Sequence, residues 1–254
     1  MNILAYLQRI NYLGDLSPNL ATLTQLQMAH MLAVPFENLD IHAGREIRLD
    51  TKQIYQKVVE EKRGGFCYEL NGLYYDLLLE LGYEVRRISA RVHSTEQQGY
   101  GAEYDHLALI ATIDGKEYIT DVGYGEFLLC PLVFEIDIEQ QDIRGAVYAI
   151  RTHKEGYFRI EKRLESSWKP EYIFKPVARD YEEFVPMCNY QQYDPTSYFQ
   201  KQKLISQLTP NGRVTLTSSK LKILENGKIS EREVESAQVF DQLLKTYFSI
   251  SIPS

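Results

Sequence analysis

Two apolar runs joined by Asp114-Gly115 restrict the fold more than any other feature of this sequence. Residues 106–113 (HLALIATI) precede the dipeptide and residues 116–122 (KEYITDV) follow it. Asp-Gly between two such runs predicts a β-hairpin with a two-residue type I′ turn. Further strands are expected at residues 83–92, 133–138, 146–152, 157–162, 172–175, 213–216 and 220–225. So many short strands separated by turns favour an antiparallel barrel or sandwich.

The register of this hairpin brings a histidine and a carboxylate together. If the hairpin closes at the Asp-Gly turn, His106 faces Gly123 on the opposite strand. Alternate residues share one face of a strand, so Asp121 lies on the same face as His106, diagonally across the ladder. Such a carboxylate fixes the tautomer of an imidazole and stabilises its charged form. The alternative is that His106, one of five histidines, begins a strand by chance.

A cysteine follows two glycines at the start of a helical pattern. In the segment Arg63-Gly64-Gly65-Phe66-Cys67, the cysteine is followed by apolar residues at spacings of three and four. The pattern predicts a helix over about residues 68–81 that Gly82 ends. Cys67 then lies in the first turn, where unpaired N–H groups and the helix dipole favour a nucleophilic thiolate. The alternative is a buried structural cysteine, which is the more usual role of a free cysteine.

The first 81 residues are expected to be largely helical. One face of a first helix carries four apolar residues, Leu4, Leu7, Ile10 and Leu13. Thr22 or Thr24 is expected to cap a second helix, which Val34-Pro35 ends. Asp50 is expected to cap a third helix reaching about Glu61. Near the C-terminus, residues 180–205 are expected to be helical or irregular, and residues 236–248 form an amphipathic helix.

Composition excludes several classes of partner. A net charge of -7 and a pI of about 5.4 disfavour nucleic acid and anionic membranes as partners. No apolar run approaches the roughly 20 residues of a membrane span, and the first residues lack the features of a signal peptide. The three cysteines, Cys67, Cys130 and Cys188, match neither a disulfide framework nor a zinc site. We therefore expect a reduced, cytoplasmic protein without a metal, in which Cys130 packs internally and Cys188 lies in an exposed loop.

Five motifs in order resemble those of the arylamine N-acetyltransferases. They are residues 7–12 (LQRINY), 34–39 (VPFENL), 63–67 (RGGFC), 106–107 (HL) and 121–125 (DVGYG). The resemblance implies an α+β fold in three parts: an N-terminal helical bundle (1–84), an antiparallel β-barrel (85–190) and a C-terminal α/β lid (191–254). The bundle, the barrel and the cysteine helix would then resemble the core of papain-like proteases and transglutaminases.

The resemblance also implies a reaction. Acetyl-CoA would acetylate Cys67, and an arylamine, arylhydrazine or N-hydroxyarylamine would then collect the acetyl group in a ping-pong cycle. His106 would act as the base and Asp121 would orient it. The resemblance gives Glu37 and Arg63 a structural role as an ion pair beside the site.

Binding residues are implied by position in the family pattern. Phe36, Phe66, Tyr124 and Phe127 would supply aromatic surface for the acceptor, with core packing as the alternative for each. Tyr190, Thr196, Ala102 and Glu103 match positions that contact coenzyme A in eukaryotic relatives. Vertebrate members have a small Thr-Gly pair where this chain has Ala102-Glu103, and the phosphates of coenzyme A would not favour Glu103. The chain also lacks the vertebrate insertion after the barrel, which suggests a bacterial type.

Three other functions are compatible with the same residues. A papain- or transglutaminase-like hydrolase would use the same Cys-His-Asp order. An amide synthase of the same fold would close a macrolactam from a tethered acyl chain. A catalytically inactive scaffold would bind an acyl-CoA or a partner protein.

Overall fold

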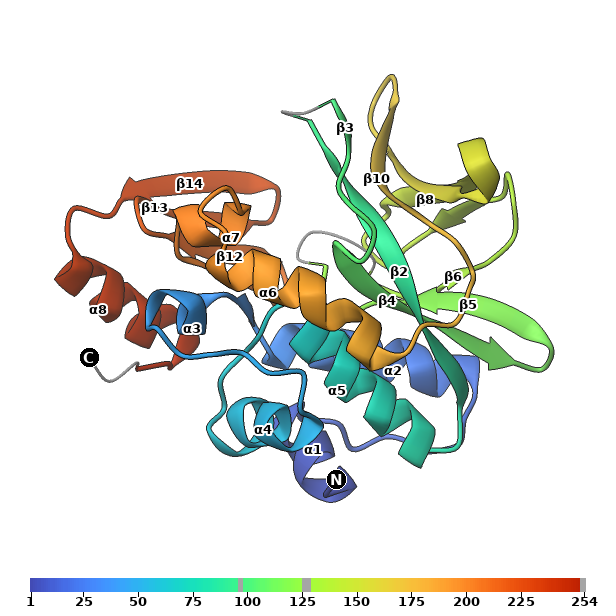
Figure 1. The fold of residues 1–254 in the computed structure, drawn as a ribbon, viewed down its shortest axis with the longest axis horizontal. Helices are drawn as coiled ribbons and strands as arrows, with labels where there is room; N and C mark the ends of the chain where they lie inside the picture. The colour runs from blue at the N-terminus through green and yellow to red at the C-terminus, as the bar shows by residue number, and fades with distance from the viewer. Residues whose placement is uncertain (96–97, 125–128, 252–254) are drawn as a thin grey trace.

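A computed structural model describes residues 1–95, 98–124 and 129–251 and shows an α+β fold (Figure 1). The α-helices are α1 (Ile3–Arg9), α2 (Leu20–Ala33), α3 (Leu39–His42), α4 (Thr51–Tyr55), α5 (Cys67–Glu80), α6 (Val185–Tyr193), α7 (Tyr198–Lys201) and α8 (Ala237–Phe248). A π-helical turn, η1 (Gln56–Glu60), follows α4, and 3-10 turns form η2 (Lys154–Gly156) and η3 (Tyr181–Phe184). The strands are β1 (Phe36–Glu37), β2 (Glu84–Ser94), β3 (Gly99–Tyr100), β4 (His106–Ile113), β5 (Lys116–Thr120), β6 (Leu132–Val133), β7 (Glu139–Gln141), β8 (Val147–Thr152), β9 (Phe158–Arg163), β10 (Trp168–Phe174), β11 (Leu204–Thr209), β12 (Gly212–Thr217), β13 (Lys220–Glu225) and β14 (Lys228–Glu233).

An antiparallel sheet in the order β6-β5-β4-β2-β10-β9-β8-β7 curves into a nearly closed barrel. The side chain of Gln140 on β7 links the two ends of this sheet. Its Oε1 accepts from the Val133 N–H at 2.7 Å, and its Nε2 donates to the Val133 carbonyl at 2.9 Å. Aliphatic and aromatic side chains from β2, β4, β8, β9 and β10 fill the interior. The expectation of an antiparallel barrel is confirmed.

The hairpin of β4 and β5 has the predicted turn and register. Ile113 pairs with Lys116, and the register continues to Leu109 and Thr120. Asp114 and Gly115 have φ angles of +51° and +74°. A type I′ turn requires positive φ at both central residues, so the turn chemistry fixes the register as predicted.

Helix α5 is the predicted helix, and it lies against β2 and β4 on the outside of the barrel (Figure 1). It begins at Cys67 and ends at Glu80, followed by Gly82 with a φ of +86°. Its apolar side chains join those of α1, α2 and β4 in one buried cluster, which also contains Cys67. The helix therefore holds its first residue against the hairpin.

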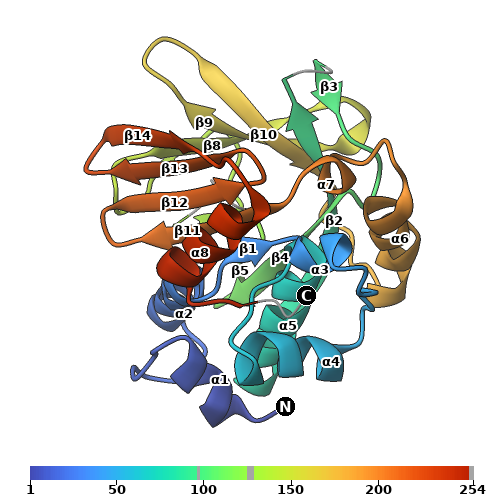
Figure 2. The ribbon, with the colours of Figure 1, turned by 90° about the vertical axis from the view of Figure 1, so that its left-hand side faces the viewer.

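The C-terminal part forms a second sheet in the order β1-β11-β12-β13-β14, with α8 packed beside it (Figure 2). Strand β1 comes from the N-terminal segment, and Phe36 pairs with Ser206 of β11. Strands β11 and β14 were not predicted from the sequence. The predicted boundary near residue 190 falls within α6, and the division into three domains stays a prediction.

Two predictions about the N-terminal helices are wrong. Leu4 and Leu13 are 74% and 99% exposed, because α1 ends at Arg9 and turns Tyr6 rather than Leu4 toward the core. Helix α2 is capped by Asn19, not by a threonine, since the Asn19 Oδ1 accepts from the Thr22 N–H at 2.9 Å. The cap predicted at Asp50 is confirmed by its bonds to the N–H groups of residues 52 and 53.

We expect Asn19→Ala to lower the free energy of unfolding by about 1 kcal/mol, because it removes the N-cap of α2. Thr24→Ala is the control, since Thr24 is only partly buried and its hydroxyl donates to the Leu20 carbonyl instead of capping the helix. We expect a change within about 0.5 kcal/mol. Urea unfolding measures both. Equal effects of the two substitutions would contradict the assignment of Asn19 as the cap.

Candidate active site

Cys67 is the first residue of α5, and a hydrogen bond holds the backbone of the residue before it, Phe66. The Phe66 N–H donates to the Glu69 Oε2 at 3.1 Å, which satisfies a backbone donor at the helix start. The side chain of Cys67 is close to solvent-inaccessible, with the residue 4% exposed. The sulfur thus sits in a buried position at the positive end of the helix dipole.

His106 and Asp121 form the diagonal pair that the hairpin register predicts. His106 begins β4, Asp121 directly follows β5, and the His106 Nε2 lies 2.6 Å from the Asp121 Oδ2. Both side chains are buried. Burial alone would lower the pKa of His106, but the charge of Asp121 and hydrogen bonds to Asp121 and Cys67 raise it to about 10. The imidazole is therefore charged at neutral pH.

The structure brings Cys67 into the same group. Its thiol lies close enough to the His106 ring to be one of the groups that raise the pKa of that ring. Because the Nε2 atom is engaged by Asp121, Nδ1 is the ring nitrogen that remains for the sulfur. A thiol, a charged imidazole and a carboxylate thus lie next to one another, and a group of this kind can perform covalent catalysis.

Asn71 links α5 to the hairpin that carries His106 and Asp121. The sequence analysis did not identify it. Its Nδ2 donates to the Asp121 Oδ1 at 2.8 Å and to the Leu107 carbonyl at 2.7 Å. Its Oδ1 accepts from the Val122 N–H at 2.9 Å. Asn71 stands four residues after Cys67, so both lie on one face of α5, and this spacing is a signal that could have identified it.

Gly123 allows the hairpin to approach α5 closely. A Cβ atom at this position would lie 2.8 Å from the Cys67 Cα and 2.7 Å from the Asn71 Nδ2. The Gly123 N–H also donates to the Asp121 Oδ1 at 2.9 Å. A side chain at residue 123 would therefore push the hairpin away from Cys67 and Asn71.

Two tyrosine rings surround the imidazole. The rings of Tyr124 and Tyr172 lie 5.4 Å and 5.5 Å from the ring of His106. Burial, followed by the charge of Asp121, holds the pKa of Tyr172 well above its usual value. Tyr124 was predicted as a site residue, whereas Tyr172 was not, because only the barrel brings β10 beside β2.

The other predicted acceptor residues have different environments. Phe66 is 0% exposed and packs against Tyr68 and Phe199, with ring centroids 5.0 Å and 6.1 Å away. Phe36 is partly exposed and also contacts the ring of Phe199, at 5.9 Å. Phe127 lies outside the described residues. Of the three members that the structure describes, Phe36 and Tyr124 are partly exposed.

The predicted coenzyme A positions lie beside carboxylates. The hydroxyl groups of Tyr190 and Thr196 are 2.9 Å apart, and the Thr196 N–H donates to the Asp194 Oδ1 at 2.8 Å. Ala102 is exposed, and the neighbouring Glu103 accepts from the Tyr157 hydroxyl at 2.6 Å. The Glu103 carboxylate also lies 4.0 Å from the Arg179 guanidinium, so both signs of charge occur beside these four positions.

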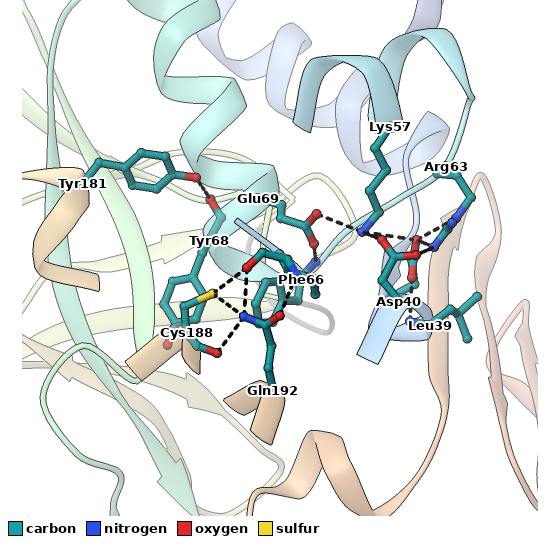
Figure 3. Close-up of polar contacts among 12 residues, drawn as sticks. Leu39, Asp40, Lys57, Arg63, Phe66, Tyr68, Glu69, Tyr181, Cys188 and Gln192 are labelled. Carbon is teal, nitrogen blue, oxygen red and sulfur yellow. Dashed lines mark hydrogen bonds and ion pairs between the residues drawn. The ribbon is translucent and has the colours of Figure 1, made fainter. Parts of the chain in front are cut away.

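A buried network of ion pairs involves residues on both sides of Cys67 in the sequence (Figure 3). Arg63 contacts Glu37 at 2.7 Å and Asp40 at 2.9 Å, so the predicted Glu37–Arg63 ion pair is present. Lys57, from the π-helical turn η1, contacts Asp40 at 2.7 Å and Glu69 at 2.8 Å. Burial alone would lower the pKa of Lys57, but the surrounding carboxylates raise it. The network thus holds the Glu69 carboxylate that caps the Cys67 turn.

The other two cysteines, Cys130 and Cys188, differ from Cys67 in their surroundings. Cys188 is 1% exposed on α6, not in an exposed loop as predicted, because its side chain faces inward and its thiol donates to the Ile47 carbonyl at 3.9 Å. Its sulfur accepts from the Gln192 Nε2 at 3.3 Å. Burial raises the pKa of Cys188 and that of Cys130, the latter to about 11. Neither thiol has an imidazole partner that would favour its thiolate.

No group of three or more His, Cys, Asp or Glu side chains in the part of the chain that the structure describes could hold a metal ion. None of the helices in the described ranges combines the length and apolar character needed to cross a membrane.

Comparison with known proteins agrees with this geometry. A family model described as N-acetyltransferase matches residues 19–254. Arylamine N-acetyltransferase 1 of Homo sapiens is 32% identical over 279 residues, which cover 99% of this chain and 95% of that protein.

Solved structures share the fold over almost the whole chain. The Mycobacterium marinum arylamine N-acetyltransferase in complex with CoA has a TM-score of 0.89 and 29% identity, over 98% of this chain and 93% of that one. A Bacillus cereus arylamine N-acetyltransferase, described as having a unique Cys-His-Glu catalytic triad, has a TM-score of 0.89 and 26% identity, over 99% of this chain and 100% of that one. This chain has Asp121 as the carboxylate partner of its histidine.

We expect Asp121→Asn to lower the pKa of His106 from about 10 to its ordinary value of about 6.5 or below, because the amide removes the charge that outweighs burial. A raised pKa keeps a ring protonated until the pH passes that value, so at pH 8 the ring is charged in the wild type and neutral in the variant. A ¹⁵N NMR titration of the imidazole measures the change. Asp114→Asn, at the other end of the hairpin, is the control and should leave the titration unaltered. A pKa near 10 in Asp121→Asn would contradict the assignment.

We expect Asn71→Ala to lower the free energy of unfolding by about 2–4 kcal/mol, because it leaves the buried Val122 N–H and Leu107 carbonyl without partners. The control is Asn211→Ala, an exposed asparagine at the β11–β12 turn, with an expected change within about 0.5 kcal/mol. Urea unfolding checks the pair, and equal losses would show that Asn71 does not join the helix to the hairpin.

Proposed function

The chain belongs to the arylamine N-acetyltransferase family, and on that premise we propose that it transfers an acetyl group from acetyl-CoA to an arylamine or arylhydrazine through acetyl-Cys67. The observation that carries the proposal is the placement of the Cys67 thiol, at the start of α5, beside the His106–Asp121 pair joined at 2.6 Å. A coenzyme A thioester as donor is supported by the coenzyme A complex of the M. marinum relative.

In the first half-reaction, the Cys67 sulfur attacks the thioester carbonyl. A C–S bond forms to Cys67, the C–S bond to coenzyme A breaks, and the leaving thiolate takes the proton that His106 holds. The raised pKa of His106 suits this role, since the ring is protonated and paired with the sulfur before the donor binds. Asp121 stabilises the charged ring and fixes its tautomer throughout.

In the second half-reaction, the amine nitrogen attacks the acetyl-cysteine carbonyl. His106, neutral after the first step, takes the amine proton, and the Cys67 sulfur leaves as a thiolate. The same groups would acetylate the oxygen of an N-hydroxyarylamine. Both tetrahedral intermediates carry an oxyanion, for which the free N–H groups at the start of α5, including that of Cys67, are the proposed donors.

We assign the acceptor surface to Tyr124 and Phe36. Tyr124 is partly exposed and its ring lies 5.4 Å from that of His106, so a flat amine stacked there would present its nitrogen to the acetyl-cysteine. Phe36 offers a second partly exposed ring. The fully buried Phe66 would act through packing, by supporting the residue before Cys67.

The proposed reaction requires Cys67 as a free thiol. All three cysteines are free, which suits a reducing compartment such as the cytoplasm. Four residues remain proposed contacts of coenzyme A: Tyr190, Thr196, Ala102 and Glu103.

Intact-protein mass spectrometry tests the proposal. We expect acetyl-CoA, without an acceptor, to add one acetyl group that maps to Cys67, and an arylamine to remove it as the N-acetyl product. Cys67→Ala should gain no acetyl group and lose transfer. Cys130→Ala is the matched control, a cysteine to alanine change outside the site, and should be acetylated like the wild type.

A folded wild-type protein whose Cys67 can be alkylated but is not acetylated by acetyl-CoA would overturn the proposal. Acetylation of the Cys67→Ala variant at the wild-type rate would overturn the assignment of the nucleophile. Circular dichroism of each variant establishes that loss of transfer is not loss of fold.

A further inference from the structure

The chain turns just before His106 in a conformation that is uncommon for residues other than glycine. Tyr104, two residues before His106, has a φ angle of +65°. Positive φ is unfavourable for residues with a Cβ atom, and tyrosine is not one of the types, such as asparagine, that adopt it more readily. The strand that carries the imidazole begins directly after this turn. A backbone of this kind persists only where surrounding contacts hold it.

Bonds from two elements hold this turn. From the barrel, the Ser89 Oγ on β2 accepts from the Tyr104 N–H at 2.8 Å. From α5, the Tyr68 hydroxyl donates to the Tyr104 carbonyl at 2.7 Å and lies 3.2 Å from the Asp105 carbonyl oxygen. A hydroxyl has one hydrogen to donate, so the shorter contact is the principal bond. The residue that directly follows Cys67 is thus bonded to the turn that precedes His106.

The surroundings of Tyr68 fix the direction of its hydroxyl. The residue is 0% exposed, and its ring packs against those of Phe66 and Phe184, with centroids 5.0 Å and 5.9 Å away. Its backbone carbonyl accepts from the Tyr181 hydroxyl at 2.7 Å (Figure 3). Burial, followed by the charge of Cys67, raises the pKa of Tyr68 well above its usual value. The hydroxyl therefore keeps its proton and remains a donor.

A second bond from the same helix lies on the other side of His106. The Asn71 Nδ2 donates to the Leu107 carbonyl at 2.7 Å. Tyr68 and Asn71 are three residues apart, so their side chains leave one face of α5. The backbone of His106 is thus held before and after the residue by the helix that carries the Cys67 thiol.

We propose that Tyr68 is a positioning residue that holds the His106 ring against the Cys67 thiol, an inference that rests on the proposed acyl transfer through Cys67. Its hydroxyl does not contact the reacting atoms and acts through the backbone of Tyr104. Without the hydroxyl, the turn stays bonded to Ser89 on β2 and loses this bond to α5. The imidazole then shifts relative to the sulfur, and a shift of about 1 Å in a catalytic group can cost about 100-fold in rate.

Tyr68→Phe tests the proposal, because it removes the hydroxyl and keeps the ring. Tyr83→Phe is the matched control, since Tyr83 is also buried and its hydroxyl donates to a backbone carbonyl, that of Asn19, at 2.9 Å. We expect circular dichroism to show both variants folded. The acetyl donor is p-nitrophenyl acetate, so the rate does not depend on binding of coenzyme A. Acetylation of Cys67 should be about tenfold slower or more in Tyr68→Phe and unchanged in Tyr83→Phe.

A ¹⁵N NMR titration of the His106 ring gives a readout that a loss of stability alone would not change. Cys67 is one of the groups that raise the pKa of His106 to about 10. If the ring shifts away from the sulfur, this contribution falls. We therefore expect a lower pKa of His106 in Tyr68→Phe than in the wild type, and no change in Tyr83→Phe.

A wild-type rate of acetylation in Tyr68→Phe would overturn the proposal. Equal slowing in the two variants would also overturn it, because loss of any buried hydroxyl would then have the same effect. Slower acetylation with an unaltered titration of His106 would show that the hydroxyl does not act through the imidazole. The titration needs no acyl donor, so it tests Tyr68 even if the wild type is not acetylated, a result that would refute the proposed function alone.

Discussion

The first five residues of helix α5 fix every part of the candidate site. Cys67 supplies the thiol, Glu69 caps the turn that carries it, and Asn71 bonds to both strands of the hairpin. These side chains leave one rigid helix in different directions, so their relative positions are set by helical geometry. The imidazole and its carboxylate reach the sulfur only because the hairpin docks against this helix end.

The parts of the site that follow local rules could be predicted from the sequence. The Asp-Gly turn fixes the register, and the register alone pairs His106 with Asp121. The roles of Tyr172 and Lys57 could not be predicted, because their partners lie on elements distant in the chain. Asn71 was missed although its spacing from Cys67 places both on one face of α5, and its bond to Asp121 is visible only in the fold. The wrong assignments have the same origin. Burial of Cys188 depends on where α6 packs, and periodicity does not show that α1 ends at Arg9.

Buried charge holds the segment before Cys67 in place. Each member of the network of Glu37, Asp40, Lys57, Arg63 and Glu69 contacts an oppositely charged side chain. Such a network contributes little net stability, but removal of one member leaves another buried charge without its partner. The network therefore favours one arrangement of this segment over others.

Strand β1 is bonded on both sides by segments that are far from it in the chain. The Glu37 N–H donates to the Gly65 carbonyl at 2.9 Å, and Phe36 pairs with Ser206 on the other edge. A ribosome releases Phe36 and Gly65 long before residue 206. Until β11 emerges, the nascent chain carries an unpaired strand edge close in sequence to Cys67, and such edges can pair with other chains. The sheet closes only after long-range pairing, which slows folding, so late synthesis rather than early collapse completes the surroundings of the thiol.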